Sequence, residues 1–314
     1  MTEFHLTPLP ELPEGHRSGF ACLVGRPNAG KSTLTNALVG QKIAITANKP
    51  QTTRHTIRGI VNREDAQLIL VDTPGLHRPR TLLGERLNDL VLSTLSEVDV
   101  VVFCLPADQK IGPGDRFIAE QLARLNERRT KTPIIAAVTK ADVVSRDALA
   151  SHLLEVAELA DFSDIIPVSA VEGFQVEALT DLLVSHLPEG VKFYLDGELT
   201  DEPESVMIAE LIREAAIEGV RDELPHSLAV VVDEIIEKDK QGRPHLTVHA
   251  SIFVERDSQK GIIIGKQGSR LRKVGSQARV GIEALLGAHV YLDLRVKVAK
   301  DWQRDPKLLN RLGF

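Results

Sequence analysis

Short apolar runs alternate with amphipathic stretches over roughly the first 190 residues of the chain. The continuous runs are typical of strands that are buried on both faces, and they occupy 20–25, 67–72, 98–105, 134–140 and 164–170. The amphipathic stretches predict helices at 33–39, 114–126, 148–159 and 176–187. This alternation indicates βαβ units, and therefore a mainly parallel sheet with helices on both faces. The stretch 56–65 predicts one additional, antiparallel strand.

The pattern changes after a polar stretch at 187–203, which is rich in Pro, Gly and acidic residues, as domain boundaries tend to be. A helix is expected at 204–219, followed by two alternating strands at 227–237 and 244–255. A short helix, a glycine loop and a long helix to about 286 come next, and the last strand is expected at 289–298. This αββααβ order is that of the type-II KH fold.

Length and composition limit the remaining possibilities. A chain of 314 residues exceeds the size of most single cores, so we expect two domains. No stretch approaches the ~18–20 apolar residues that span a bilayer. The first fifteen residues carry three Pro and three Glu, unlike a signal or transit peptide, and predict a disordered tail. Cys22 and Cys104 both lie in apolar runs and are expected to be buried free thiols in a reducing cytoplasm.

The net charge of -6 is unevenly distributed. From Pro203 onward there are 18 Lys and Arg against 16 Asp and Glu, whereas the preceding part has 20 against 28. Between Arg256 and Arg279 seven basic residues face a single acid, Asp257. Such a run could be a solvated helix face, but the glycine loop within it favours a surface that faces phosphates.

The sequence GRPNAGKS has the spacing of a P-loop and lies between a predicted strand and a predicted helix. Glycines allow backbone N–H groups to surround the phosphates, and the helix N-terminus contributes its positive end. Lys31 is expected to reach the β- and γ-phosphates, and Ser32 to bind Mg²⁺. The residues of this predicted phosphate site are Gly25, Arg26, Pro27, Asn28, Ala29, Gly30, Lys31, Ser32 and Thr33.

The sequence DTPG follows the strand at 67–72 and predicts the second part of the nucleotide site. Asp72, at the carboxyl end of this strand, is positioned to hold Mg²⁺, and the Gly75 N–H to contact the γ-phosphate. Thr73, Pro74 and Leu76 complete the predicted loop. On its own DTPG is equally good as a turn, but a P-loop upstream favours the nucleotide site.

The sequence TKAD, from Thr139 through Lys140 to Asp142, predicts which base is bound. A carboxylate accepts hydrogen bonds from both N1–H and the exocyclic amine of guanine, so Asp142 should exclude ATP. The common pattern begins with Asn, and a Thr hydroxyl replaces one amide hydrogen bond but not two. Ser169 and Ala170 are expected to supply a backbone contact to the guanine carbonyl.

Taken together, the segments GRPNAGKST, QTTRHTIRG, DTPGLH, TKAD and VSA resemble the Era family of bacterial GTPases. The resemblance continues through LPHS at 224–227, the GKQG loop and the closing segment 296–314, so it covers the chain from about Gly19 onward. It implies an α/β P-loop GTPase domain followed by an α+β type-II KH domain. The expected division is a tail at 1–17, the GTPase domain at 18–190, a linker at 191–203 and the KH domain at 204–314.

The catalytic residues predicted in this way are Lys31, Thr53, Gly75 and Asn28. Leu76 stands where Ras-like enzymes place the glutamine that orients water, so the intrinsic hydrolysis of GTP should be slow. Resemblance to GTPases that use potassium implies that Asn28 binds K⁺, and the alternative is a simple hydrogen-bonding role in the P-loop. Thr52 and Thr53 are alternative second ligands of Mg²⁺, beside Ser32 and Asp72. Arg54 could be catalytic, contact RNA or be solvated.

The GKQG loop is the candidate RNA clamp, because two such glycines let an RNA backbone approach closely. Its support comes from the αββααβ order, the basic flanks and the family resemblance. The predicted RNA-binding residues are Lys260, Gly265, Lys266, Gln267, Gly268, Arg270, Arg272 and Lys273. Aromatic residues make up 4% of the chain, so base stacking is not expected to be the main source of recognition.

The resemblance therefore implies a GTPase that binds the 3′ end of 16S rRNA and assists maturation of the 30S subunit. GTP or GDP and Mg²⁺ are the expected cofactors, together with K⁺ if Asn28 binds this ion. We expect a cytoplasmic monomer that binds no DNA and associates at most peripherally with the inner membrane. The alternative is a signalling GTPase that relays its nucleotide state to a protein partner, with the KH fold as a scaffold.

Overall fold

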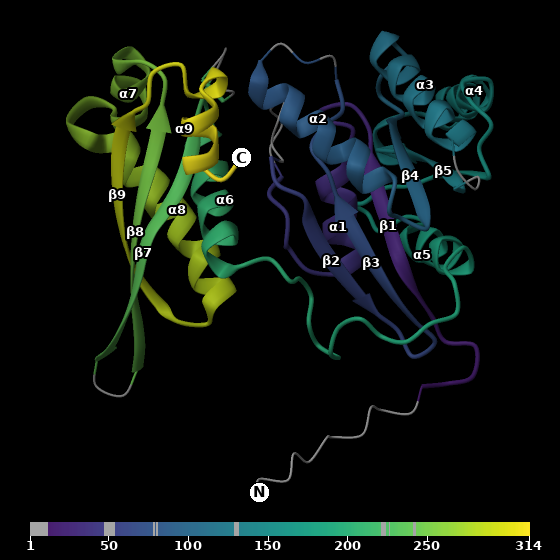
Figure 1. Ribbon diagram of the computed structural model, residues 1–314, viewed down its shortest axis with the longest axis horizontal. Coiled ribbons are helices and arrows are strands. Elements are labelled where there is room, and N and C mark those ends of the chain that lie inside the picture. Colours follow the sequence, from purple (N-terminus) through teal and green to yellow (C-terminus); the bar gives the residue numbers. More distant parts are fainter. Residues whose placement is uncertain are drawn as a thin grey trace, which may run out of the picture.

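The computed structural model of the chain describes residues 12–46, 54–77, 79, 81–128, 132–220, 224–225, 227–240 and 243–314. Two sheets, each with its own layer of helices, lie side by side and are joined by an extended segment (Figure 1). Thr52 and Thr53, the alternative Mg²⁺ ligands, lie outside the described residues, as does most of the predicted N-terminal tail.

The first sheet has the strand order β2-β3-β1-β4-β5-β6 and is parallel except for β2. Its parallel strands are β1 (Arg17–Val24), β3 (Ala66–Asp72), β4 (Val100–Pro106), β5 (Ile134–Thr139) and β6 (Asp164–Pro167). Strand β2 (Ile57–Asn62) runs antiparallel along β3, so the predicted antiparallel strand is confirmed. Every residue of β3, β4 and β5 is buried, which explains why these strands are mostly apolar.

Helices cover both faces of this sheet. On one face lie α1 (Lys31–Val39) and α5 (Val176–Ser185), whose leucines pack against β1 and β3. On the other face lie α2 (Leu82–Leu95), α3 (Pro113–Arg128) and α4 (Arg146–Ala157). The sequence pattern did not predict α2, although its buried residues recur at helical spacing and its N-cap, Thr81, accepts a hydrogen bond from Gly84 N–H.

The second sheet has the order β7-β8-β9, with β7 (Ala229–Lys240) antiparallel and β9 (His289–Val298) parallel to β8 (Arg243–Val254). Helices α6 (Glu204–Ile217) and α8 (Ser269–Leu286) pack on one face, and α7 (Asp257–Ile264) leads into the glycine loop. The αββααβ order and the bounds of β9 agree with the sequence expectation. The structure adds a short C-terminal helix, α9 (Pro306–Arg311), which the periodicity did not predict.

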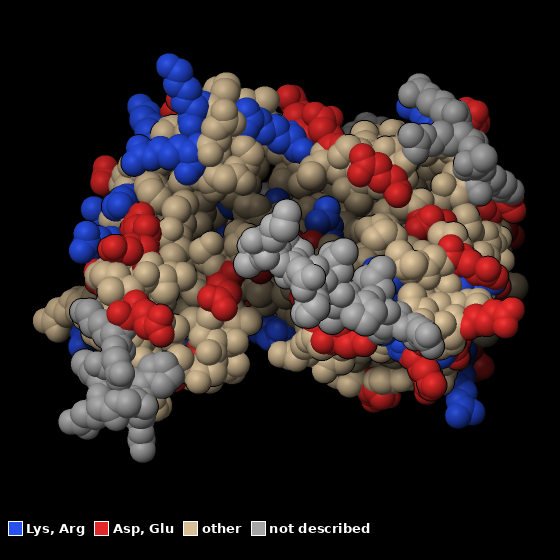
Figure 2. Space-filling model, turned by 60° about the horizontal axis from the view of Figure 1, so that its bottom comes forward, with Lys and Arg blue, Asp and Glu red and all other residues tan. Residues whose placement is uncertain are grey.

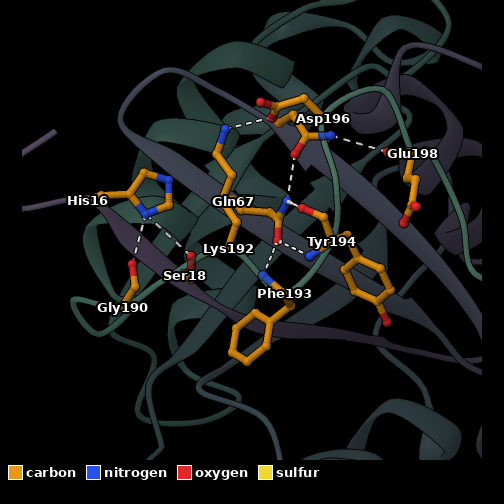
Figure 3. Close-up of polar contacts among 10 residues, drawn as sticks. His16, Ser18, Gln67, Gly190, Lys192, Phe193, Tyr194, Asp196 and Glu198 are labelled. Atoms are coloured by element: carbon orange, nitrogen blue, oxygen red, sulfur yellow. Dashed lines mark hydrogen bonds and ion pairs between the residues drawn. The ribbon is translucent and has the colours of Figure 1, made fainter. Parts of the chain in front are cut away.

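The segment between the two sheets follows the first sheet closely instead of hanging free (Figure 3). The fully buried Gln67 of β3 donates a hydrogen bond to the carbonyl of Tyr194 and accepts hydrogen bonds from the N–H groups of Phe193 and Tyr194. The Ile60 N–H of edge strand β2 donates to Leu199 O at 2.9 Å. Arg58 of β2 also forms an ion pair with Asp201 at 2.9 Å, so the predicted linker is attached to the first sheet as far as Asp201.

The other end of this segment meets the start of the chain's folded part. His16 is buried and its Nδ1 lies 2.9 Å from Gly190 O (Figure 3). Strand β1 begins at Arg17, so folded structure starts within the stretch that was expected to be a tail. None of the described helices is both long and apolar enough to cross a bilayer.

Candidate nucleotide and RNA-binding sites

The P-loop joins β1 to α1 at the carboxyl edge of the first sheet. Gly30 precedes α1, whose first two residues are Lys31 and Ser32, so the backbone N–H groups of this helix end face the place where phosphates would lie. Lys31 is buried, and its ammonium donates hydrogen bonds to the carbonyls of Gly25 at 3.2 Å and Arg26 at 3.1 Å. The loop thus holds its lysine inward, in a position to bind an anion.

The environment of Lys31 disfavours the charged form of its amine. Burial lowers the pKa of the ammonium, while the nearby carboxylate of Asp72 acts in the opposite direction. Cys22 and Cys104 flank the same region, and burial raises the pKa of the Cys104 thiol to about 12. These thiols are inert at neutral pH, whereas Lys31 is a buried cation that a polyphosphate would stabilise.

The DTPG segment lies against the P-loop. Asp72 is the last residue of β3 and is fully buried, and Thr73 Oγ1 donates to Leu23 O at 2.7 Å. A Cβ on Gly75 would lie 2.8 Å from the Pro27 nitrogen, so only glycine fits at this approach. The Leu76 side chain is buried in the core beside α2 and α3, and therefore takes no part in orienting water.

The base-binding end is formed by two loops that are bonded to each other. Ala141 N–H donates to Val168 O, and Ser169 N–H to Phe174 O. Asp142 is exposed and thus open to a base, while Lys140 forms an ion pair with Asp108 at 3.1 Å. Ser169 is buried and its Oγ accepts from Glu172 N–H, and Ala170 follows it in the chain. Thr139, at the end of β5, contacts the P-loop directly.

Two side chains of the P-loop point in different directions. Arg26 forms an ion pair with the buried Asp115 of α3, its Nε lying 2.7 Å from the carboxylate oxygen. Its charge is therefore balanced away from the phosphates. Asn28 has a left-handed backbone with φ of 65° and is exposed at the surface of the loop.

The GKQG loop connects α7 to α8 at the end of the second sheet. Gly265, Gln267 and Gly268 all have positive φ, between 51° and 74°, so the chain turns sharply and leaves Lys266 exposed. Lys273, one turn into α8, is exposed as well, and Lys260 on α7 is partly exposed. This arrangement presents cations around a close-approach loop that precedes a helix N-terminus.

Two predicted RNA-binding arginines donate hydrogen bonds to backbone carbonyls. The Arg270 guanidinium donates to the carbonyls of Ala216 and Glu218 at the end of α6, at 3.3 and 2.8 Å. Arg272 donates to the Gln267 carbonyl of the glycine loop at 3.0 Å. Arg270 therefore supports the packing of α8 on α6, and Arg272 supports the loop itself. Sequence proximity to the loop could not distinguish these roles from direct contact.

A groove of about 380 Å³ runs from the glycine loop between α8 and the edge strand β9. Tyr291 lies on its rim with 60% of its surface exposed, and Arg279 lines it from α8. Arg279 ends the basic run that was expected to face phosphates, whereas Tyr291 was not predicted, although an exposed aromatic on an edge strand is a recognisable signal for base stacking. Figure 2 shows Lys and Arg gathered at the upper end of the KH lobe on the left, whereas acidic residues are spread over the right lobe.

Arg54 lies between the two units, in none of the three environments that the sequence suggested. It is 1% exposed, and it donates to the carbonyls of Leu228 at 2.5 Å and Pro225 at 3.0 Å, which both precede β7. Its guanidinium also lies over the rings of Trp302 and Phe314, at 5.5 and 5.8 Å. Desolvation by burial lowers the pKa of Arg54 to about 9. The hydrogen bonds and ring contacts therefore stabilise a guanidinium that is no longer hydrated.

The C-terminal segment completes this junction. Trp302 is fully buried and donates from Nε1 to Ser227 O, while Phe314 stacks on His55 with ring centroids 5.1 Å apart. Arg86 of α2 donates to Asn310 Oδ1 and Phe314 O, at 2.7 and 2.6 Å. The segment that begins at Arg54, and the helix that follows DTPG, therefore both rest on the second unit.

The fold and these sites define a P-loop GTPase joined to a KH domain. A family profile described as "50S ribosome-binding GTPase" matches residues 20–140, and one described as "KH domain" matches residues 223–303. The chain is 64% identical over 306 residues to the GTPase Era of Streptomyces coelicolor, covering 95% of each protein. It is 66% identical over 299 residues to that of Mycolicibacterium smegmatis, covering 95% of this chain and 99% of the relative.

Solved structures agree with this assignment. The crystal structure of Era in complex with MgGDPNP and nucleotides 1506–1542 of 16S ribosomal RNA has a TM-score of 0.89 and 34% identity. The alignment covers 95% of this chain and 99% of that one. The same values hold for a point variant of Aquifex aeolicus Era bound to GDP and aluminium fluoride. The chain belongs to the Era family of GTPases.

Proposed function

We propose that this GTPase binds the 3′ end of 16S rRNA with its KH domain, in a manner controlled by the bound nucleotide, and thereby assists maturation of the 30S subunit. The observation that carries the proposal is that Arg54, next to Thr52 and Thr53, and Arg86, in the helix that follows DTPG, both contact the KH unit directly. The similar Era structure holds both MgGDPNP and the 3′ segment of 16S rRNA. We expect the protein to act in the cytoplasm.

Different residues of the proposed nucleotide site bind the phosphates and Mg²⁺. Lys31 and the N-terminus of α1 would bind the phosphates, and Ser32 and Asp72 would hold Mg²⁺ together with Thr52 or Thr53. Mg²⁺ fits here because a buried carboxylate and a hydroxyl at a helix N-terminus supply the oxygen ligands that it prefers. The bound ion would neutralise charge on the phosphates. Gly75, packed on Pro27, would report the γ-phosphate to α2.

The proposed coupling follows from the position of Arg54. Arg54 directly follows Thr52 and Thr53 in the sequence, one of which would bind Mg²⁺. Because Arg54 is buried among backbone carbonyls of the KH unit, a nucleotide-dependent displacement of Arg54 would either move the KH unit or break these hydrogen bonds. The domain division proposed here remains 18–190 and 204–314, with the segment between them attached to the GTPase domain.

The test measures the affinity for an RNA oligonucleotide that corresponds to nucleotides 1506–1542, in GDPNP–Mg²⁺ and in GDP. We expect tighter binding with GDPNP by about fivefold or more. Arg54→Ala should bring this ratio close to one. Arg63→Ala, which removes an arginine paired with Asp65 and Asp181 within the GTPase domain, should leave the ratio unchanged.

Absence of RNA binding in both nucleotide states would overturn the RNA proposal. Equal and tight binding in both states would retain the RNA partner but overturn the coupling. A ratio that survives Arg54→Ala would show that another contact transmits the nucleotide state.

We also propose that K⁺ assists hydrolysis at Asn28. The exposed amide of Asn28, on the surface of the P-loop, offers an oxygen to a cation beside the phosphates. A cation there would stabilise charge that develops in the transition state, the role an arginine serves in other GTPases. Replacing K⁺ by Na⁺ at constant ionic strength should slow GTP turnover in the wild type and have no effect on Asn28→Ala. Equal turnover of the wild type in the two salts would overturn this role.

A further inference from the structure

Thr139 ties the base-binding end of the nucleotide site to the P-loop. Its side chain is 4% exposed, and its Oγ1 donates a hydrogen bond of 2.7 Å to the carbonyl of Ala29. A Cβ on Gly30 would have Thr139 Cβ and Oγ1 as its nearest neighbours, both at 3.5 Å. Thr139 therefore packs against the two P-loop residues that precede Lys31.

The hydrogen-bonding capacity of this side chain is limited. A threonine hydroxyl carries one proton, and here that proton is donated to Ala29 O. An asparagine, which commonly begins this motif in GTPases, carries two amide protons. An asparagine could donate one proton to the P-loop and one to a ligand at the same time. The single hydroxyl proton of Thr139 can be donated either to the P-loop or to a ligand, but not to both.

The ligand group that would face Thr139 follows from the two ends of the site. The phosphates lie on the P-loop, and the Watson–Crick edge of guanine lies on Asp142, three residues after Thr139. The part of the nucleotide between these anchors is the ribose and the five-membered ring of the base, and N7 of this ring is a pure acceptor. N7 therefore needs a donor, and the Thr139 hydroxyl has already donated its proton.

We propose that Thr139 serves as a tether of the P-loop and leaves N7 of guanine without a hydrogen-bond donor. The inference rests on the proposed nucleotide site. Guanine is then selected at its Watson–Crick edge, by Asp142, and at its carbonyl, by the backbone near Ala170. The site consequently accepts guanine nucleotides that lack the N7 acceptor, such as 7-deazaguanosine diphosphate. An Era-family GTPase with asparagine at this position should discriminate against them.

The test compares the dissociation constants of GDP and 7-deaza-GDP by calorimetry, with Mg²⁺ and the full chain. The wild type should bind the two ligands with affinities equal to within about twofold. Thr139→Asn should prefer GDP by about 5- to 10-fold, because the second amide proton then bonds to N7. Thr139→Val removes the hydrogen bond to Ala29 O but adds no donor, so it should weaken the affinity for both ligands by the same factor.

A wild-type preference for GDP of about fivefold or more would overturn the proposal, because N7 would then have a donor. Equal affinities in Thr139→Asn would overturn the assignment of position 139 as the determinant. Failure of the wild type to bind GDP would instead contradict the nucleotide site as a whole, so the two failures are distinguishable.

Discussion

Two glycine loops in this chain contain the same types of residue, but the lysine is buried in one loop and exposed in the other. Each contains two glycines and a lysine and leads into a helix, the P-loop into α1 and the GKQG loop into α8. In the P-loop Lys31 is 6% exposed and bonded to the loop's own carbonyls. In the GKQG loop Lys266 is exposed.

This difference predicts different ways of binding phosphates for the two loops. Lys31 has lost its hydration already, so a polyphosphate meets a preformed and strongly interacting cation. Lys266 keeps its water and is screened by salt, so its attraction for an RNA backbone is weaker and less specific. The first loop can carry selectivity, whereas the second needs the adjoining groove and Tyr291 to provide it.

The largest expected effect comes from Lys31→Ala. It should weaken the affinity for GDP and GTP by about 100-fold or more, because a buried, charge-assisted contact to the phosphates is lost. The matched change Lys266→Ala in the other loop should leave nucleotide affinity unchanged. Calorimetric titration of both variants with GDP measures this contrast. A loss of less than about tenfold in Lys31→Ala would contradict the role given to its burial.

An intermediate effect is expected from the two glycines of the GKQG loop. In Gly265→Ala the new Cβ would lie 2.7 Å from Arg270 Cβ, whereas in Gly268→Ala it meets nothing within 4 Å. Both positions have positive φ, so Gly268→Ala should lose about 1 kcal/mol of unfolding free energy from backbone strain alone. Gly265→Ala should lose about 1–3 kcal/mol more. Urea denaturation measures both, and equal losses would contradict the close packing of Gly265.

The smallest effect concerns salt. Lys266→Ala should reduce the slope of log Kobs for RNA against log salt by about 0.7, the loss of one contact to a single-stranded backbone. Lys192→Ala, which removes a lysine paired with Asp196 on the other unit, should leave the slope unchanged. RNA titrations between low and moderate salt provide the measurement. An unchanged slope in Lys266→Ala would place this lysine away from the RNA.

Local patterns sufficed for much of the architecture. Strand β9 has the bounds that its alternating pattern predicts, and the buried runs of β3, β4 and β5 are recognisable because they are mostly apolar. Helix α2 carried an equally clear signal, with Leu83, Leu87, Val91 and Leu95 at intervals of four, and could have been predicted. The short α9 could not, because six residues give too little periodicity and its burial comes from contact with α2 and Trp302.

The roles of individual arginines were beyond the sequence. Arg54, Arg270 and Arg272 all lie beside a predicted functional loop, and their chemistry is the same. Only their three-dimensional surroundings show that Arg54 is buried between the units, while Arg270 and Arg272 bond to backbone carbonyls. Proximity in sequence to a binding loop is thus a poor guide to the direction in which a long side chain points.

The sequence by itself determined the class of each domain and the family, and it predicted the nucleotide-binding residues, because these depend on short motifs whose residues act with their immediate neighbours. The tertiary structure decided how the domains meet. Arg54 donates hydrogen bonds to the carbonyls of Leu228 and Pro225 and lies over the rings of Trp302 and Phe314. Thr139 donates a hydrogen bond to the carbonyl of Ala29, 110 residues earlier. Contacts between residues so far apart in sequence form only when the chain folds. No local pattern of residues shows which backbone carbonyl will accept a hydrogen bond from a buried donor.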